Sequence, residues 1–227
     1  KRKNLMLMTG GFLIAGILFN MYYQYSYEKD YLSEFSDQGE ALDKLETGTD
    51  LAVLKTGDES VYRYDQMGTH NYENSSMQTG TNGTSYYFSV ASGDITNFFN
   101  EVDLNTPWDY HYENLDSRTI LDRLAAVKYF VVKAGEEEYL PYGYDTLAAE
   151  VEKNDKLYRA YECKNALPIG YTYDSYIPEE KYAKMSTVEK QQALLQGVIL
   201  SNSTVPETTS EFNDREVPYK LVTGSGC

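Results

Sequence analysis

The stretch LDSRTILDRLAAVKYFVVK, residues 115–133, decides the fold because its hydrophobic period changes halfway along. The first half has apolar residues at helical spacing, which predicts a short amphipathic helix capped by Asp116 or Ser117. The apolar face comprises Ile120, Leu121, Leu124 and Ala125, and the charged face comprises Arg118, Asp122 and Arg123. Residues 127–132 are β-branched and aromatic, and they predict a buried strand. A helix and a strand joined by almost no loop must pack together, so we expect an α+β core.

The composition favours an acidic soluble portion and excludes nucleic acid as a partner. The chain has 227 residues, enough for one or two domains, and a formal net charge of −15. Recognition of nucleic acid requires a basic surface, which this balance does not supply. The 23 tyrosines are the compositional outlier. Because tyrosine combines a flat apolar face with a polar tip, it suits exposed β-structure and also saccharide-binding surfaces.

The N-terminal segment has the features of a retained membrane helix. Leu5–Tyr23 carries no charged residue, and as a helix it would span about 28 Å, close to the ~30 Å hydrocarbon core of a bilayer. Basic residues 1–3 predict a cytoplasmic start, and the tyrosines at 22, 23, 25 and 27 suit the far interface. A cleavable signal peptide is the alternative, but no small residues follow at a suitable cleavage position. We expect residues 1–27 to be a transmembrane helix in membrane lipid, with the acidic portion extracytoplasmic.

The rest of the chain predicts short elements of both kinds. Strands are expected at residues 51–55, 61–67, 85–90, 127–132 and 157–164. Helices are expected at residues 28–45, 92–102 and 145–153, after Pro178, and at 186–195, where a capping box begins the helix. The predicted fold class is α+β, with a mixed, largely antiparallel sheet and short helices after one N-terminal transmembrane helix. Residues 28–200 form the predicted extracytoplasmic domain, and residues 201–227 a polar tail that begins a truncated β module.

A long polar loop is the best candidate for a ligand-binding site. Residues 68–85 are polar, show no clear periodicity, and are longer than most loops in compact domains. Amide and hydroxyl groups beside aromatic faces suit sugar binding, although a purely structural loop is the simpler alternative. The ligand-binding candidates are Asn74, Ser75, Asn82, Ser85, Tyr86 and Tyr87.

No catalytic residue, cofactor or metal site is predicted. The sequence has no phosphate-binding glycine-rich loop and no HExxH, CxxC or GxSxG motif. His70 beside Asp65 and Glu73 could join a metal site, but histidines in loops more often serve as plain hydrogen-bonding groups. Cys163 lies in a predicted strand as a packing residue. Because Cys227 is the last residue, we expect no disulfide between the two cysteines.

Three blocks of the sequence resemble the YfhO family of bacterial membrane proteins. They are NSSMQTGTNGTSYYFS (74–89), SRTILDRLAAVKYFVVK (117–133) and ALPIGYTYDSYIPEEKYAKMSTVEKQQALLQGVIL (166–200). The blocks follow the order found in the family and cover most of residues 60–200. The last block is long and unusual in composition, which makes the resemblance specific.

The resemblance implies a polytopic membrane protein similar to GT-C glycosyltransferases, which use a polyprenyl-phosphate sugar donor. Such proteins are associated with glycosylation of lipoteichoic acid or other envelope polymers. The chain is then expected to be a fragment in the bacterial cell membrane whose domain supports or orients the glycan acceptor. The catalytic residue is expected on an early outer loop outside this chain. A non-enzymatic sensor or assembly ectodomain is the alternative. Metal transport is disfavoured because the outer part lacks clustered His, Cys or Met residues.

Overall fold

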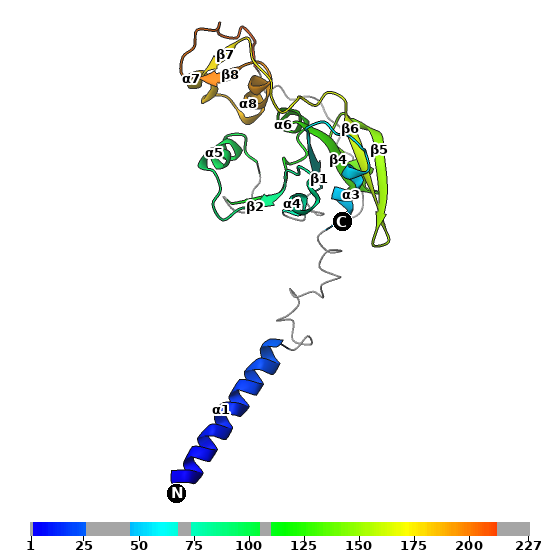
Figure 1. The fold of residues 1–227 in the computed structure, drawn as a ribbon. Coiled ribbons are helices and arrows are strands. Elements are labelled where there is room, and N and C mark those ends of the chain that lie inside the picture. The colour runs from blue at the N-terminus through cyan, green and yellow to red at the C-terminus, as the bar shows by residue number, and fades with distance from the viewer. Residues whose placement is uncertain (1, 26–45, 68–73, 105–109, 213–227) are drawn as a thin grey trace, which may run out of the picture. The chain divides into compact units, whose positions relative to one another are not determined.

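The computed structural model describes residues 2–25, 46–67, 74–104 and 110–212 (Figure 1). The chain divides into two compact units, Lys1–Leu45 and Glu46–Cys227. The helices are α1 (Arg2–Tyr25), α3 (Gly48–Leu54), α4 (Ser75–Thr79), α5 (Gly93–Glu101), α6 (Thr119–Leu124), α7 (Glu179–Tyr182) and α8 (Thr187–Leu194), with a 3-10 turn η3 (Glu137–Tyr139). The strands are β1 (Arg63–Gln66), β2 (Tyr86–Tyr87), β3 (His111–Tyr112), β4 (Val127–Lys133), β5 (Tyr144–Lys153), β6 (Lys156–Cys163), β7 (Tyr176–Pro178) and β8 (Val198–Leu200).

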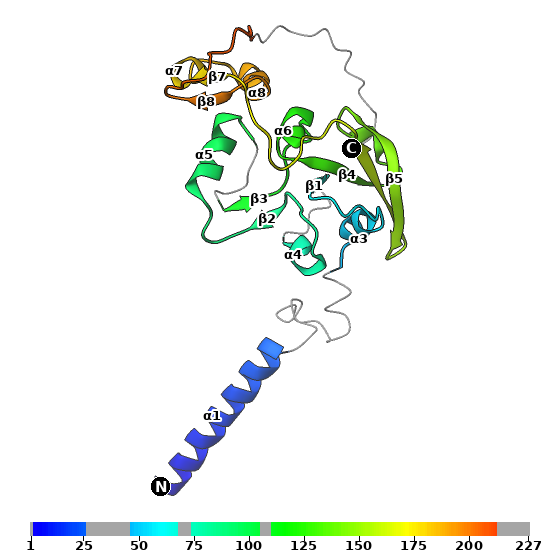
Figure 2. The same cartoon turned by 45° about the horizontal axis from the view of Figure 1, so that its top comes forward.

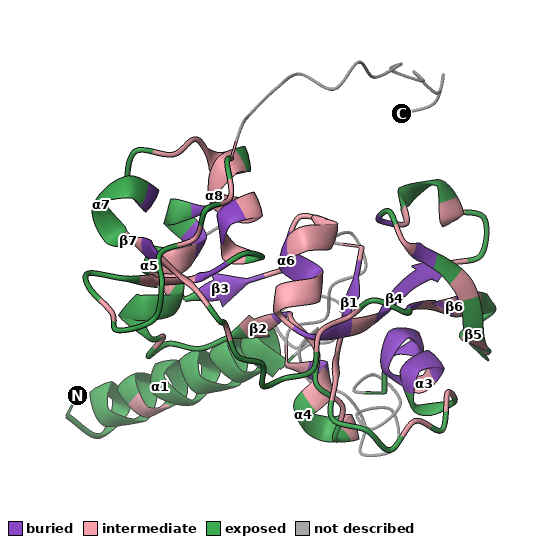
Figure 3. Ribbon diagram, turned by 90° about the horizontal axis from the view of Figure 1, so that it is seen from above, coloured by how far each residue is buried: buried purple, intermediate pink, exposed green. Residues whose placement is uncertain are grey.

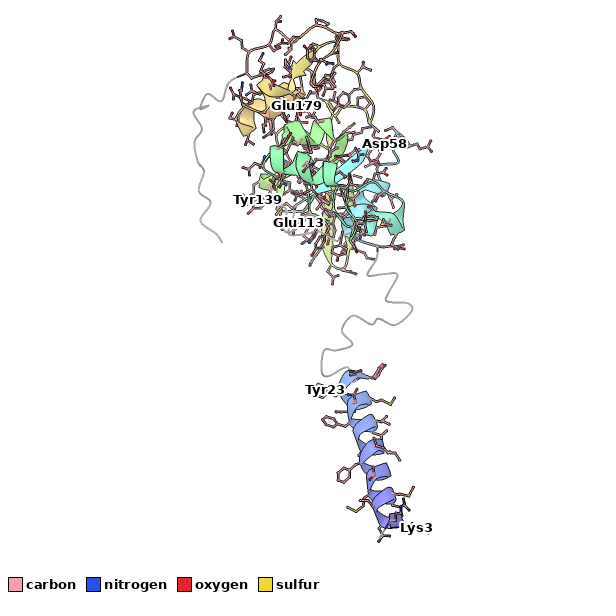
Figure 4. All side chains as sticks on the ribbon, turned by 90° about the vertical axis from the view of Figure 1, so that its left-hand side faces the viewer. Lys3, Tyr23, Asp58, Glu113, Tyr139 and Glu179 are labelled. Atoms are coloured by element: carbon pink, nitrogen blue, oxygen red, sulfur yellow. The ribbon has the colours of Figure 1, made fainter. Side chains whose placement is uncertain are left out.

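Helix α1 exposes its apolar side chains and buries none of its residues. Figure 3 shows the helix as exposed along almost its whole length, and Figure 4 shows side chains projecting around it between the labelled Lys3 and Tyr23. A helix with an apolar surface all round is stable in lipid rather than in water. By length and composition, α1 is suited to cross a membrane, as the sequence predicts.

The second unit is built on a four-stranded sheet with the order β1-β4-β6-β5. Strand β1 runs parallel to β4, whereas β4 with β6 and β6 with β5 are antiparallel. The β5–β6 hairpin turns at Asn154 and Asp155, which both have positive φ, as a tight two-residue turn requires. The predicted α+β class with a mixed, largely antiparallel sheet is confirmed.

Strand β4 lies at the centre of the core because both of its faces are covered. Tyr129 and Val131 belong to an apolar cluster that includes residues of α3. Phe130 and Val132 belong to a second cluster, which includes residues of α5 and α6. This alternation follows from the two-residue period of a strand. Burial on both faces explains why residues 127–132 are almost continuously apolar.

The connection from β1 to β4 contains the candidate ligand-binding residues. It contains, in chain order, α4, β2, α5, β3 and α6, and β2 pairs with β3 in a two-stranded ribbon (Figure 2). The Arg118 guanidinium group donates to the carbonyl oxygens of Val102 and Asp103, at 2.6 and 2.5 Å. These bonds satisfy backbone acceptors just after α5 and hold that helix beside α6.

The C-terminal part of the domain is a small unit in which β7 and β8 pair in parallel around α7 and α8. The predicted capping box of α8 is confirmed. The Ser186 hydroxyl accepts from the Glu189 N–H at 3.3 Å, and the Glu189 carboxylate accepts from the Ser186 N–H at 2.9 Å. Ile177, Tyr182 and Ala193 form its apolar core. Beyond β8, residues 206–208 bond to the backbone of β7.

The strand predicted at residues 51–55 is wrong, because this segment is helix α3. The Thr47 hydroxyl accepts from the Asp50 N–H at 3.2 Å and caps the helix. Gly48 permits the helix to approach the sheet closely, since a Cβ atom there would lie 2.2 Å from the ring of Tyr158. The sequence LAVLK alone is compatible with either structure, and the cap selects the helix.

The helix predicted at residues 145–153 is also wrong. This segment is strand β5, which pairs with β6 from Tyr144 to Lys153. Its alanines and glutamates favour a helix locally, but pairing with a neighbouring strand outweighs that preference.

Three further expectations change in detail. Asp116 and Ser117 have φ values of 54° and 53°, so neither adopts the extended backbone of an N-cap; Arg118 precedes α6 instead. The strand expected at 85–90 is limited to the two residues of β2, and the polar loop contains helix α4. The helix expected at 28–45 lies outside the described residues.

Candidate functional site

Asn74 fixes the ribbon to the start of the polar loop. Its side-chain amide donates to the Tyr87 carbonyl at 3.0 Å, and its side-chain oxygen accepts from the Tyr87 N–H at 3.1 Å. Its φ of 61° lies in the left-handed region, which asparagine tolerates better than most residues. The Asn74 amide therefore forms with β2 the pair of hydrogen bonds that a neighbouring strand would form.

The ribbon presents aromatic side chains on a fixed backbone. The rings of Tyr86 and Tyr112 pack in a tilted arrangement at a centroid distance of 4.6 Å, and Tyr112 packs edge-on against Phe99 of α5 at 4.8 Å. Tyr87 contacts Tyr110 edge-to-face at 5.5 Å, and both rings are more than one-third exposed. An anchored inner pair thus supports an accessible outer pair, an arrangement that can stack on the apolar face of a sugar.

Ser85 belongs to the base of this ribbon. The residue is buried, and its hydroxyl donates to the backbone carbonyl of Glu113, which Figure 4 labels. Among the candidates, Asn74, Ser85, Tyr86 and Tyr87 therefore lie together on the ribbon.

Ser75 and Asn82 lie toward strand β1 instead. The Asn82 side-chain amide donates to the Tyr62 carbonyl at 3.1 Å, and the backbone carbonyl of Asn82 accepts from the Tyr64 N–H at 3.0 Å. Ser75 is buried. Its hydroxyl forms a hydrogen bond with the Tyr64 phenol, and this bond opposes the rise in the pKa of Tyr64. The six candidates consequently form two groups. The first group lies at the ribbon and includes the exposed ring of Tyr87, and the second joins the polar loop to the sheet.

A buried carboxylate at Asp50 was missed by the sequence reasoning. One of its oxygens accepts from the hydroxyls of Tyr64 and of Thr81, the latter at 2.9 Å. The other accepts from the Thr47 hydroxyl at 2.7 Å. Burial and the neighbouring Asp50 raise the pKa of the Tyr64 phenol above its ordinary value. The Thr-x-x-Asp spacing at 47–50 is a helix-start signal that could have revealed this cluster.

A second buried carboxylate corrects the predicted charged face of α6. Asp122 was placed with Arg118 and Arg123 on the solvent side, but it is completely buried. No hydroxyl or N–H group of the described residues donates to its carboxyl oxygens, and its polar partner is Asp65. Its neighbour Asp65 is also buried and accepts from the Thr84 hydroxyl at 2.7 Å and the Leu115 N–H at 3.2 Å.

The two carboxyl groups share one environment. Burial, followed by the negative charge of Asp65, raises the pKa of Asp122. Burial likewise raises the pKa of Asp65, although its hydrogen-bond donors oppose this. Tyr144 of β5 lies near both acids, and burial together with their negative charge raises the pKa of its phenol; Cys163 of β6 lies near Asp122. Paired carboxylates can perform acid–base chemistry, but this pair is sealed from solvent, so it serves the core rather than a ligand.

The structure describes no cluster of His, Cys, Asp or Glu that could hold a metal ion within residues 2–25, 46–67, 74–104 and 110–212. His70 and Glu73, which the sequence places near Asp65, lie outside these ranges. Cys163 is buried, as the packing interpretation predicts.

An apolar helix suited to a bilayer and a folded α+β unit define a membrane protein with a globular portion attached to its anchor. A family model described as "Bacterial membrane protein YfhO" matches residues 2–223, and this chain belongs to that family. It is 27% identical over 223 residues to "Uncharacterized protein YfhO" of Bacillus subtilis (strain 168). The aligned region covers 92% of this chain and 24% of that protein. The chain therefore spans about a quarter of the length of this relative. No solved structure matches it.

Proposed function

We propose that this chain is part of a membrane protein that resembles GT-C glycosyltransferases and glycosylates lipoteichoic acid or another envelope polymer. In this proposal a polyprenyl-phosphate sugar is the donor, and the α+β domain lies outside the cell and orients the glycan acceptor. The acceptor role is supported by the aromatic side chains that the β2–β3 ribbon exposes. Its exposed Tyr87 and Tyr110 rings stand beside polar groups that are themselves fixed by hydrogen bonds.

The ribbon suits a glycan because its binding surface is already ordered. Asn74 commits its amide to the backbone of Tyr87, so little conformational entropy is lost when a sugar stacks on the ring. Tyrosine can also donate a hydrogen bond to a sugar hydroxyl from the rim of the same contact.

Saturation-transfer NMR tests acceptor binding with the full chain in nanodiscs. Teichoic-acid fragments at millimolar concentration should receive saturation from the protein, and Tyr87→Ala should weaken binding by about 3- to 10-fold, the effect of one aromatic contact. Tyr142→Ala is the matched control, because Tyr142 is highly exposed on another part of the domain. No transfer to the fragments, or equal transfer with Tyr87→Ala, contradicts the acceptor role.

The extracytoplasmic orientation has a separate test. Tyr142→Cys in a Cys227→Ser background should react with a membrane-impermeant maleimide in intact cells, because position 142 is exposed and the native Cys163 is buried. Reaction only after cell lysis would place the domain in the cytoplasm and remove the envelope acceptor from consideration.

A non-enzymatic sensor or assembly ectodomain is the second candidate. It is favoured by an exposed apolar segment that follows the ribbon, where Phe88 and Val90 lie at the surface. Sugar transfer to an envelope acceptor by the whole membrane protein supports the first function. Acceptor binding without transfer by the whole protein supports the second.

A further inference from the structure

The segment between the ribbon and helix α5 is apolar and exposed. Phe88 and Val90 are 49% and 89% exposed. Together with the exposed rings of Tyr87 and Tyr110 they form what we call the apolar tip. Figure 2 shows this segment running along the periphery of the second unit between β2 and α5.

The apolar tip lies where the described part of the ribbon ends. Within residues 74–104 and 110–112, the ribbon ends with a hydrogen bond from the Phe88 N–H to the Tyr110 carbonyl at 2.9 Å. Exposed aromatic and aliphatic side chains gathered in one short segment usually mark a contact with a protein or a membrane.

The charge distribution favours a bilayer as the occupant. Residues 85–93, SYYFSVASG, contain no charged side chain in a chain whose formal net charge is −15. A strongly acidic domain is repelled by anionic lipid over most of its surface, whereas an uncharged segment is not. Tyr and Phe are also residue types that favour the boundary between lipid headgroups and acyl chains.

The anchor places a bilayer within reach of the domain. Twenty residues, 26–45, connect α1 with the second unit. A chain of this length can span at most about 70 Å. Tethering makes a weak surface contact intramolecular, so a small apolar segment can bind where the free domain would not.

We propose that the apolar tip inserts into the interface of the bilayer that holds α1. Phe88 and Val90 would enter the boundary between headgroups and acyl chains, and Tyr87 and Tyr110 would remain at the headgroup level. The contact would give the domain a preferred orientation on the membrane. It does not depend on which side of the membrane the domain lies.

Fluorescence quenching from within the lipid tests the insertion. An NBD group attached at Val90→Cys, in the full chain with Cys227→Ser, reports the surroundings of the tip. The nanodiscs contain phosphatidylcholine with a minority of phosphatidylglycerol and a doxyl-labelled lipid. Tyr142→Cys is the matched control, because Tyr142 is 87% exposed and Val90 is 89% exposed. We expect doxyl lipid to reduce the emission at position 90 by about twofold and to leave position 142 unchanged.

A charge substitution shows whether the apolar side chains cause the contact. Phe88→Asp should abolish the quenching at position 90, because a charged group is costly at the acyl boundary. Leu147→Asp on β5 is its control, since Leu147 is 48% exposed, close to the 49% of Phe88. Far-UV circular dichroism and thermal unfolding establish that each variant keeps the fold.

Three results would overturn the proposal. Equal quenching at positions 90 and 142 would mean that the tip has no preference for lipid. A blue-shifted NBD emission at position 90 without doxyl quenching would mean that the tip contacts protein. Unchanged quenching in a folded Phe88→Asp variant would mean that the label, rather than the native side chains, enters the bilayer.

Discussion

The two carboxyl groups at Asp50 and Asp122 are equally buried, but their surroundings differ in kind. Asp50 accepts hydrogen bonds from three hydroxyl groups, of Thr47, Tyr64 and Thr81. Asp122 accepts from no hydroxyl or N–H group of the described residues, and its polar partner is a second buried acid, Asp65. Both carboxyl groups are removed from water, so the hydrogen-bond donors around each group decide how it is stabilised.

The two carboxyl groups contribute to the stability of the domain in different ways. At Asp50 the donors hold three elements together: the start of α3, strand β1 and the loop after α4. At Asp122 the missing donors favour the protonated acid, and the neighbouring Asp65 favours it further by like-charge repulsion. The first site links elements by hydrogen bonds, whereas the second makes the fold sensitive to pH.

The largest effect is expected at Asp50. Asp50→Ala removes the acceptor for three hydroxyl groups, of which those of Tyr64 and Thr47 belong to nearly inaccessible residues. Buried donors without partners are costly, so we expect a loss of about 3–5 kcal/mol in the free energy of unfolding. Hydrogen exchange of the β4 amides in the full chain measures this quantity separately from any unfolding of α1.

Thr81→Val is the control for the Asp50 prediction, because it removes one donor and keeps the carboxylate. It should cost only about 1 kcal/mol. Equal losses for the two variants would show that the carboxylate does not organise the cluster.

The second prediction concerns the pH dependence caused by the acid pair. The folded-state pKa values of Asp122 and Asp65 are raised, so the folded chain holds protons that the unfolded chain releases. Their stabilising contribution is complete below the ordinary carboxyl pKa near 4. It is lost as pH rises toward the raised values, by at most about 1.4 kcal/mol per pH unit for each proton.

Asp122→Asn should remove much of this dependence. The amide has a similar shape, cannot ionise, and can donate to Asp65. At pH 8 the variant should therefore be more stable than the native chain by about 1–3 kcal/mol, and at pH 4 the two should differ little. Hydrogen exchange of β4 amides at several pH values measures both. A native-like decline with pH in the variant would show that groups other than Asp122 cause it, beginning with its neighbour Asp65.

The sequence predicts the parts of the fold that depend on local patterns. The strand at 127–132, the helix around 92–102 and the capping box at Ser186 each rest on signals within about ten residues, and the structure contains all three. Residues 145–153 were predicted as helix because their pairing with β6 is a tertiary contact that composition does not reveal.

The candidate site shows the same division. The polar loop next to aromatic residues could be recognised from composition, and four of its six candidates lie on one ribbon. The buried state of Asp122 could not be recognised, because helical periodicity places it beside Arg118 and Arg123 on the face away from Leu121. Asp122 is buried because β1, β5 and β6 bring Asp65, Tyr144 and Cys163 to that face of the short helix.

The smallest effect is expected at a third carboxylate, Asp58, which is satisfied by a cation near the surface. Its burial is outweighed by hydrogen bonds from Lys128, Ser60 and Tyr129, which hold the pKa of Asp58 well below its ordinary value. Ionised Asp58 therefore contributes stability above the ordinary carboxyl pKa, and this contribution is lost as pH falls below about 4. Lys128→Met should cost only about 0.5–1 kcal/mol at neutral pH, because the Lys128 side chain is 28% exposed and the pair is partly screened. Hydrogen exchange at low and high salt checks this, since the difference between the native chain and the variant should shrink in high salt. A loss as large as that of Asp50→Ala would mean that a charged partner and hydroxyl donors stabilise a carboxylate equally here, and the contrast between the sites would then lie in burial alone.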